Sequence, residues 1–266
     1  MFIFTGDNIM KVTVCEISNS FKGLAEDWNA LVEHVNSNES ELVLLPELSF
    51  STWLAETPDY DPVLWQEAVD AHDKWIARFN EMPNAMIAGS RAVIRNKINH
   101  NDGYIWDSIN GYRKTHTKYY LPIDNGFFEA SWFKKGAKEF IPVETEKAKL
   151  GYQVCTDLWF SNHAWDYGKQ GVDIILNPRA TPMCTREKWI AGGRTTSVVS
   201  GCYCLSSNFS GVNDQGFEFA GRGWIIEPKE GDILGMTNSK NKFLTLDINL
   251  NDAKEAKNIY PRNVEM

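Results

Sequence analysis

The sequence predicts an α/β protein with four layers, an α-β-β-α sandwich in which two mixed β-sheets pack face to face. Three observations lead to this prediction. Short apolar runs that are typical of buried strands alternate with stretches whose apolar residues recur at helical spacing. Asn110-Gly111 stands between two β-rich runs, which indicates an antiparallel hairpin. The expected strands are so numerous that two sheets, covered by helices on their outer faces, would leave few long edges exposed.

Ten segments are expected to form strands because they are short and either apolar or alternating. Residues 41–46 form a continuous apolar run, as expected of a strand that is covered on both faces. Residues 104–109 and 112–119 flank the Asn-Gly turn and should pair with each other. In chain order, the expected strands are 11–17, 41–46, 85–94, 104–109, 112–119, 149–154, 173–177, 202–208, 224–226 and 243–248.

Helices are expected between these strands. Residues 21–36 place Leu24, Trp28 and Leu31 on one face, at spacings of three and four residues. The other segments with helical character are 63–79, 162–170 and 186–199. Such stretches have an apolar side that must be buried, so we expect them to pack against the sheets.

The chain is expected to form a single domain over residues 10–266. No repeat, low-complexity stretch or Pro/Gly/Ser-rich linker divides it. Met10-Lys11 resembles a natural start that runs straight into the first strand. Residues 1–9 are therefore interpreted as an N-terminal extension or a remnant of cloning.

The composition indicates a globular protein and argues against a nucleic-acid or membrane partner. Hydrophobic residues make up 43% of the chain and aromatic residues 12%, which is enough for a substantial core. The formal net charge is −8, and lysine and arginine are scattered, whereas nucleic-acid binders carry a basic patch. No apolar run approaches the ~20 residues that a membrane span needs.

Cysteine usage predicts a cytoplasmic protein without a disulfide framework or a zinc cluster, and no metal or other cofactor is expected. The five cysteines are odd in number and include no paired CxxC spacing, which argues against a disulfide framework and a zinc site. The first ten residues lack the basic region and cleavage site of a secretory signal. A reduced compartment fits these observations best.

Three segments can supply catalytic side chains. Glu47 follows an apolar strand and Pro46, which interrupts strand pairing and presents the carboxylate at a strand end. Lys118 lies among aromatic residues near the end of the second hairpin strand, where partial desolvation would strengthen its electrostatic effect. Cys155 ends another strand, and a turn there would expose the thiol beside backbone N–H groups. Each residue alone is more typical of an ordinary surface or core position.

Taken together, these segments resemble the nitrilase superfamily of carbon–nitrogen hydrolases. The matching pieces are Leu44-Leu45-Pro46-Glu47, Lys118-Tyr-Tyr-Leu-Pro122 and Gly151-Tyr-Gln-Val-Cys155-Thr-Asp157, in the order of the family. Supporting matches lie at 126–133, 171–178, 221–228 and 260–264. The likeness covers nearly the whole chain from Lys11, and it is strongest to the N-carbamoylputrescine amidase and β-ureidopropionase-like branches.

The resemblance implies a Glu-Lys-Cys triad that cleaves a small-molecule amide or N-carbamoyl compound through a thioester intermediate. Cys155 would attack the carbonyl carbon and Glu47 would move the proton. Lys118 and the backbone N–H of Thr156 would hold the developing negative charge. Glu129 would be a second carboxylate that orients Lys118, the substrate amine or water.

Other residues near these segments have more open roles. Trp53 and Trp159 are candidates for the walls of the substrate pocket, although ordinary core positions suit them equally well. Asp157 is expected to accept backbone hydrogen bonds at the start of the following helix. His116 and His163 would permit a Cys–His dyad, which we disfavour because nothing else in the chain supports it.

The chain departs from its relatives at Thr156, where an aromatic residue is common, at residues 161–165, and at Ser51-Thr52-Trp53. True nitrilases usually have Cys-Trp-Glu at the nucleophile, so Cys-Thr-Asp favours an amidase or N-carbamoyl-amide hydrolase. A nitrilase acting on a small nitrile and a non-catalytic binding member of the same fold remain the alternatives. The family commonly dimerises, which implies a homodimer or a higher homo-oligomer.

Overall fold

The structure is a computed structural model that describes residues 8–264 of the 266-residue chain. Residues 1–7 of the proposed extension lie outside the described residues. Ile9 already belongs to strand β1 (Ile9–Ser18) and pairs with Asn249 of β13 (Phe243–Asn249). The interpretation of residues 1–9 as an extension or remnant stays a prediction.

Thirteen strands, five of them in the N-terminal part of the chain, form the framework within the described residues. After β1 they are β2 (Leu42–Leu44), β3 (Met86–Arg95), β4 (Ile98–Asp107), β5 (Gly111–Thr117), β6 (Val143–Glu144), β7 (Lys149–Tyr152), β8 (Ile174–Pro178), β9 (Tyr203–Val212), β10 (Glu218–Ala220), β11 (Trp224–Ile226), β12 (Ile233–Met236) and β13. The helices are α1 (Phe21–Ser37), α2 (Pro62–Ile76), α3 (Glu129–Trp132), α4 (Ser161–Lys169), α5 (Arg186–Ser200) and α6 (Leu250–Ala256), with short 3-10 turns η2 (Phe79–Glu81), η3 (Cys155–Trp159) and η4 (Met183–Thr185).

Strand pairing joins all of these strands into one mixed sheet. Its main path runs β5-β4-β3-β2-β1-β9-β8-β7-β6. Strand β1 joins the two halves, because it pairs in parallel with β2 through residues 12–14 and with β9 through residues 16–18. Parallel pairs in the centre and antiparallel hairpins at the edges make the sheet mixed, as predicted.

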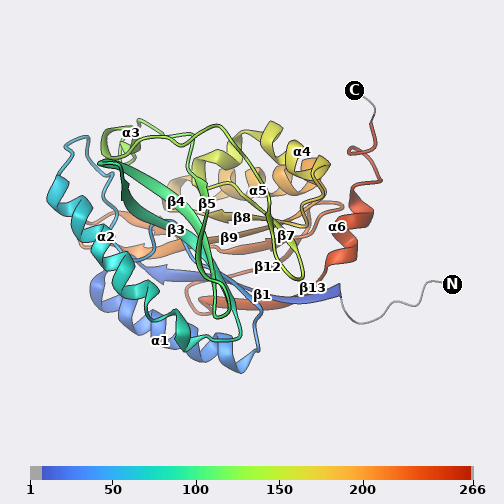
Figure 1. Ribbon diagram of the computed structural model, residues 1–266, viewed down its shortest axis with the longest axis horizontal. Helices are drawn as coiled ribbons and strands as arrows, with labels where there is room; N and C mark the ends of the chain where they lie inside the picture. Colours follow the sequence, from blue (N-terminus) through green and yellow to red (C-terminus); the bar gives the residue numbers. More distant parts are fainter. Residues whose placement is uncertain (1–7, 265–266) are drawn as a thin grey trace.

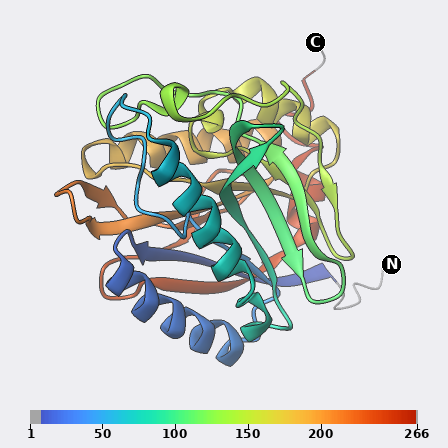
Figure 2. The ribbon, with the colours of Figure 1, turned by 60° about the vertical axis from the view of Figure 1, so that its left-hand side comes forward.

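Helices cover opposite sides of the molecule. Figures 1 and 2 show α1 and α2 on the side of β1–β5, and α4 and α5 on the side of β7–β9. A buried cluster under α1 and α2 includes Trp28 and Trp65. A second cluster brings Leu44 of β2 together with Leu176 of β8, and a third lies under α4 around Tyr167. The α/β class is confirmed, whereas the division into two sheets and four layers stays a prediction.

All four predicted helices and all ten predicted strands correspond to elements of the structure, with shifted ends. Gly111 has φ +67° and opens β5 opposite Asp107, which confirms the predicted hairpin. The N-terminal half of β4 was not predicted, because residues 98–102 are mostly polar and resemble a loop. Strands β6, β10 and β12 and helices α3 and α6 were also not predicted. None of the helices in residues 8–264 is both long enough and apolar enough to cross a membrane.

Candidate active site

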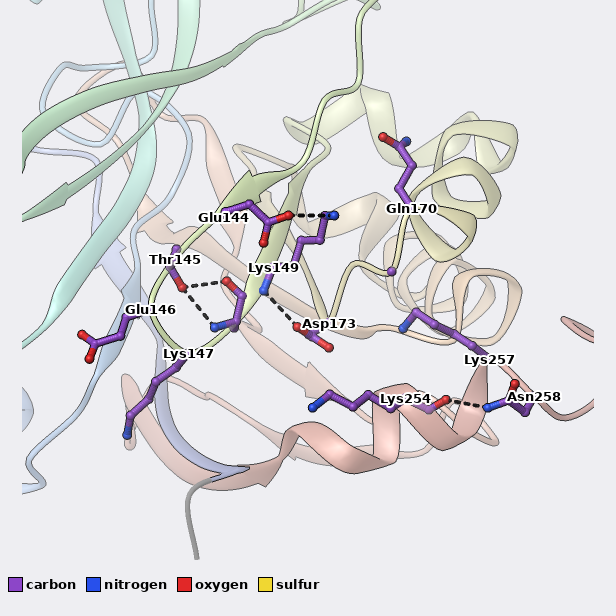
Figure 3. Close-up of a pocket in the computed structure, with 12 residues that line it drawn as sticks. Glu144, Thr145, Glu146, Lys147, Lys149, Gln170, Asp173, Lys254, Lys257 and Asn258 are labelled. Carbon is purple, nitrogen blue, oxygen red and sulfur yellow. Dashed lines mark hydrogen bonds and ion pairs between the residues drawn. The ribbon is translucent and has the colours of Figure 1, made fainter. Parts of the chain in front are cut away.

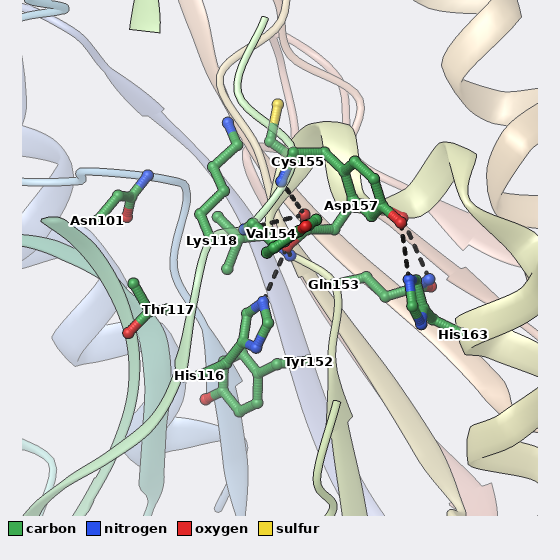
Figure 4. Close-up of polar contacts among 12 residues, drawn as sticks. Asn101, His116, Thr117, Lys118, Tyr152, Gln153, Val154, Cys155, Asp157 and His163 are labelled. Carbon is green, nitrogen blue, oxygen red and sulfur yellow. Dashed lines mark hydrogen bonds and ion pairs between the residues drawn. The ribbon is translucent and has the colours of Figure 1, made fainter. Parts of the chain in front are cut away.

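The structure brings together the three residues that the sequence selects as catalytic. Glu47 follows β2, Lys118 follows the last residue of β5, and Cys155 begins η3 after β7. The Lys118 Nζ lies 2.7 Å from the Glu47 Oε1. Glu47 and Lys118 are completely buried and Cys155 is 2% exposed. In Figure 4 the side chains of Lys118 and Cys155 extend toward the same side of the site.

Glu129 completes a buried charge cluster around Lys118. Its two carboxylate oxygens lie 2.7 Å and 2.5 Å from the Lys118 Nζ, so the ammonium is held between two carboxylates. Burial alone would lower the pKa of Lys118, but Glu129 and Glu47 outweigh it and raise this pKa above the ordinary value. Burial raises the pKa of Glu129 to about 8, with Lys118 opposing the shift and Glu47 adding to it. Lys118 is therefore a permanent cation in this site.

Asn101 is a residue of the site that sequence reasoning missed. This buried side chain of β4 donates from Nδ2 to the Glu47 Oε1 at 2.8 Å, and its carbonyl accepts the Lys118 N–H at 2.9 Å. Oε1 thus receives two donors, while the Glu47 Oε2 has no hydrogen-bond partner among the described residues. A carboxylate with one oxygen anchored and the other free is suited to take a proton.

Cys155 lies on a strained turn. Its φ of +46° is in the left-handed region, which costs a residue with a side chain about 1–3 kcal/mol. Asn177 of β8 supports the turn, because its Nδ2 donates to the carbonyls of Gln153 (2.5 Å) and Cys155 (3.3 Å). Burial, reinforced by Glu47, raises the pKa of the Cys155 thiol well above its usual value, with Lys118 acting in the opposite direction. The resting nucleophile is a thiol that needs a base.

Arg179, directly after β8, is a second feature that the sequence did not reveal. Its carbonyl accepts the Glu47 N–H at 3.3 Å, which ties the two segments together. The guanidinium is buried over the Trp224 ring, 4.0 Å from its centroid, and donates to Ser206 Oγ and Thr181 Oγ1. Burial lowers the pKa of Arg179 to about 9. Its signal in the sequence is only a charged residue that follows an apolar strand.

The two histidines do not hydrogen-bond to the nucleophile. His116 Nε2 lies 2.9 Å from Asp157 Oδ2, and His163 Nε2 lies 3.0 Å from the Tyr120 hydroxyl. The Cys155 Sγ instead lies 4.0 Å from a backbone carbonyl, that of Ala180. This geometry agrees with the preference against a Cys–His dyad.

Asp157 accepts backbone hydrogen bonds, as expected. One of them comes from Val154 at the start of η3 (3.2 Å). The same carboxylate also accepts the N–H groups of Tyr119 and Tyr120, which are distant in the sequence. These long-range contacts were not predicted.

The two tryptophans proposed as pocket walls differ in their surroundings. Trp53 is buried, packs on Phe127 and donates from Nε1 to the Gly126 carbonyl at 2.8 Å, so it supports the segment that leads to Glu129. Trp159, the last residue of η3, is 39% exposed and packs against a ring of α5. Thr156 follows Cys155 directly in η3 and is half-buried. Their contacts with substrate stay predictions.

A surface hollow of about 610 Å³ lies elsewhere on the molecule (Figure 3). The β6–β7 hairpin, the end of α4 and α6 line it, and none of the candidate catalytic residues does so. Lysines and carboxylates are mixed along its walls, and Lys149 pairs with Glu144 there. Within residues 8–264, no group of three or more His, Cys, Asp or Glu side chains is arranged to hold a metal ion.

Several proteins of known name are similar to this chain in sequence. A "Citrullinase" from Francisella tularensis is 28% identical over 188 residues, 64% of this chain and 61% of the relative. A "Hydrolase in agr operon" from Staphylococcus aureus is 25% identical over 66% of each chain. An N-carbamoylputrescine amidase from Solanum tuberosum is 33% identical over 69 residues, 26% of this chain and 22% of the relative. The chain thus spans less than two thirds of the length of these relatives.

Solved structures show the same fold. A carbon-nitrogen hydrolase from Helicobacter pylori G27 superposes with a TM-score of 0.85 at 21% identity, covering 96% of this chain and 94% of the other. An amidase from Nesterenkonia sp. AN1, in complex with acrylamide, superposes with a TM-score of 0.79 at 15% identity over 97% of both chains. The family model described as carbon-nitrogen hydrolase matches residues 11–258. The resemblance to the nitrilase superfamily is confirmed, and the chain belongs to its carbon–nitrogen hydrolase family.

Proposed function

We propose that this protein hydrolyses a non-peptide, amide-type C–N bond of a small molecule through a thioester on Cys155, as an amidase or N-carbamoyl-amide hydrolase. One observation carries the proposal. The buried Lys118 ammonium is held between Glu47 and Glu129, beside a buried thiol on a strained turn. Base, cation and nucleophile are the three groups that acyl transfer to a thiol requires.

The first half of the reaction forms the thioester. The free Oε2 of Glu47 takes the Cys155 proton as the sulfur attacks the carbonyl carbon. The carbonyl oxygen becomes negative, and Lys118 and the backbone N–H of Thr156 stabilise it. When the tetrahedral intermediate collapses, the C–N bond breaks and Glu47 returns its proton to the leaving nitrogen. Amine or ammonia departs, and the acyl group stays on sulfur.

The second half reverses these roles. Glu47 is again ionised and removes a proton from a water molecule, and the oxygen of that water attacks the thioester carbon. The same oxyanion site stabilises the second tetrahedral intermediate. The C–S bond then breaks, the Cys155 sulfur recovers its proton from Glu47, and the acid product leaves. Glu129 holds the ammonium of Lys118 in place throughout.

The relatives support the substrate class. Those named citrullinase and N-carbamoylputrescine amidase favour an N-carbamoyl compound, and the neighbour that holds acrylamide favours a small amide. Trp159 is exposed at the end of η3, four residues from the nucleophile, and would form part of the pocket wall. Both substrate types present a neutral planar carbonyl, which suits a site whose only lysine is already paired with two carboxylates.

The finer architecture and the setting belong to the same proposal. The three buried clusters, one under α1 and α2, one between the sheet halves and one under α4, support a four-layer sandwich formed by residues 10–266. We further propose that the protein works in the cytoplasm as a homodimer or higher homo-oligomer, without a metal or cofactor. Light scattering of the purified chain measures its mass in solution, and a monomer at all concentrations would contradict the oligomer.

Ammonia release from propionamide and from an N-carbamoyl amine tests the proposed function. The wild-type chain should release ammonia from at least one of them, and Cys155→Ala should not. Undiminished release by Cys155→Ala would overturn the proposal. Turnover of propionitrile, compared with that of propionamide under the same conditions, separates an amidase from a nitrilase. Absence of turnover together with an unreactive Cys155 thiol would favour the non-catalytic alternative.

A further inference from the structure

One buried carboxylate, that of Asp157, contacts the chain beside two of the three catalytic residues. Its Oδ1 accepts the backbone N–H of Tyr120 at 2.9 Å and of Tyr119 at 3.3 Å. Its Oδ2 accepts the N–H of Val154 at 3.2 Å and lies 2.9 Å from the Nε2 of His116. Asp157 is completely buried, and Figure 4 shows His116 directed at this group.

These contacts are adjacent to the reacting groups. Tyr119 follows Lys118 in the chain, and Val154 precedes Cys155. The carboxylate therefore holds, at the same time, the peptide unit that joins Lys118 to Tyr119 and the peptide unit that joins Gln153 to Val154, one residue before the nucleophile. Each hydrogen bond restrains the planar peptide unit that carries the N–H. The first unit includes the Cα of Lys118, and the second ends at the Cα of Val154, the neighbour of Cys155.

Strand pairing does not provide this restraint. Lys118 leaves the sheet at the end of β5 and Cys155 leaves it at the end of β7. In the order β5-β4-β3-β2-β1-β9-β8-β7-β6, these two strands lie near opposite ends and do not pair. The distance between the ammonium and the thiol consequently depends on contacts across the interior, and Asp157 makes three of them, to His116, Tyr119 and Tyr120.

His116 orients the carboxylate. It belongs to β5, two residues before Lys118, and is only 4% exposed. Its ring packs against that of Phe140 with centroids 4.8 Å apart, which restricts its rotation. With the Nε2 donating, Oδ2 has a second donor besides the Val154 N–H, so both oxygens of this buried carboxylate accept two hydrogen bonds.

We propose that Asp157, oriented by His116, is a positioning residue that sets the separation between the Lys118 ammonium and the Cys155 sulfur. The inference rests on the proposed function, because that separation matters only if an oxyanion forms on the attacked carbonyl. Losing the contacts of Asp157 impairs acylation of Cys155 far more than reactions of the same sulfur that form no oxyanion.

Two reagents distinguish these reactions. Acylation by 4-nitrophenyl acetate passes through a tetrahedral oxyanion and releases nitrophenolate. Alkylation by iodoacetamide displaces iodide at a saturated carbon, forms a C–S bond and needs only the deprotonated sulfur. Nitrophenolate absorbance measures the rate constant of acylation at Cys155, and intact mass measures that of alkylation. The ratio of acylation to alkylation reports the effectiveness of the oxyanion site separately from the reactivity of the thiol. Cys155→Ala provides the background for both.

Asp157→Asn keeps the shape of the side chain but replaces one oxygen by an NH₂ group that cannot accept the bonds at that position. A displacement of about 1 Å in a catalytic group typically costs about 10²-fold in rate. We expect the acylation-to-alkylation ratio to fall by about 10–100-fold. His116→Phe retains ring packing against Phe140 and removes one bond to Asp157, so it should lower the ratio less, in the same direction. This second variant keeps the test available if Asp157→Asn does not fold.

Asp27→Asn is the matched control. Asp27 is also a buried carboxylate that accepts a backbone N–H, that of Ser18, and it pairs with Lys242, with no contact to the catalytic residues. Its substitution should lower the melting temperature and leave the ratio unchanged. A fall of the ratio in the Asp27 variant equal to that in the Asp157 variant would show general loosening and overturn the inference.

The outcomes separate the two proposals. If the wild-type chain is alkylated at Cys155 but forms no acyl adduct, the proposed function fails and the positioning role fails with it. If the wild-type chain is acylated and both the Asp157 and His116 variants keep its ratio, the proposed function stands and the positioning role is wrong. A reduced acylation-to-alkylation ratio in either folded variant, with an unchanged ratio for Asp27→Asn, supports the positioning role of Asp157.

Discussion

Asn101 offers the sharpest mutational test of how Glu47 is held. Asn101→Ala removes the donor that lies 2.8 Å from the Glu47 Oε1 and leaves Lys118 as the only donor to that oxygen. A hydrogen bond to a charged group is worth about 1.5–3 kcal/mol in stability. We therefore expect the free energy of unfolding to fall by about that amount. Because Glu47 is then less firmly oriented, kcat should fall by about 10–100-fold, with a smaller change in KM.

Urea unfolding and amide turnover measure the two effects in the same preparations. Asn101→Asp extends the test, because it places a second carboxylate opposite Glu47 and should be worse than alanine in both assays. Asn36→Ala is the control, since its Nδ2 also donates one bond, to the Glu81 carbonyl at 2.9 Å, on the exposed surface of α1. Wild-type kcat in Asn101→Ala, or an aspartate variant as active as the alanine variant, would refute the reasoning.

Three further predictions concern the other residues of the site. Lys118→Met should lower kcat by about 10²–10³-fold, because an oxyanion donor is lost. It should also destabilise the fold, because the buried Glu47 carboxylate loses its counter-ion. Retained activity in a folded variant would contradict the role of Lys118. Burial raises the pKa of Glu129 to about 8, above its value in the unfolded chain, so the stability that its neutral form contributes is lost as pH rises from about 4.5 to about 8. Glu129→Gln stays neutral, so urea titrations should show its free energy of unfolding rising relative to that of the wild type over this range. A difference between the two free energies that does not change with pH would speak against the shift. Cys155 has φ +46°, so Cys155→Gly should be more stable than Cys155→Ala by about 1 kcal/mol in thermal unfolding, and equal stabilities would show that the turn is not strained.

Local signals explain why the candidate catalytic residues could be selected from the sequence. Glu47 follows a proline at the end of an apolar run, and Cys155 ends another apolar run before a turn, so each position is marked by its own neighbours. The same holds for the hairpin at Gly111, whose positive φ is a property of the Asn-Gly pair. In such cases the sequence contains the information within a few residues.

The residues that were missed depend on distant parts of the chain. Asn101 stands in a polar run that resembles a loop, and it becomes a buried strand residue only because β4 pairs with β3 and β5. Asp157 was expected to act locally, yet it binds the backbone 37 and 38 residues away, at Tyr120 and Tyr119. The link between β1 and β9 joins segments far apart in sequence and has no local signature. Tertiary pairing decides these features.

The proposed function requires Cys155 to carry an acyl group during turnover. The most direct measurement is mass spectrometry of the chain after rapid acid quenching during turnover of propionamide, followed by digestion to locate the adduct. We expect a propionyl group on the peptide that contains Cys155, and we expect none in Cys155→Ala or in chain incubated without amide. Continued ammonia release with no acyl adduct on Cys155 at any quench time, and with the same rate in Cys155→Ala, would contradict it.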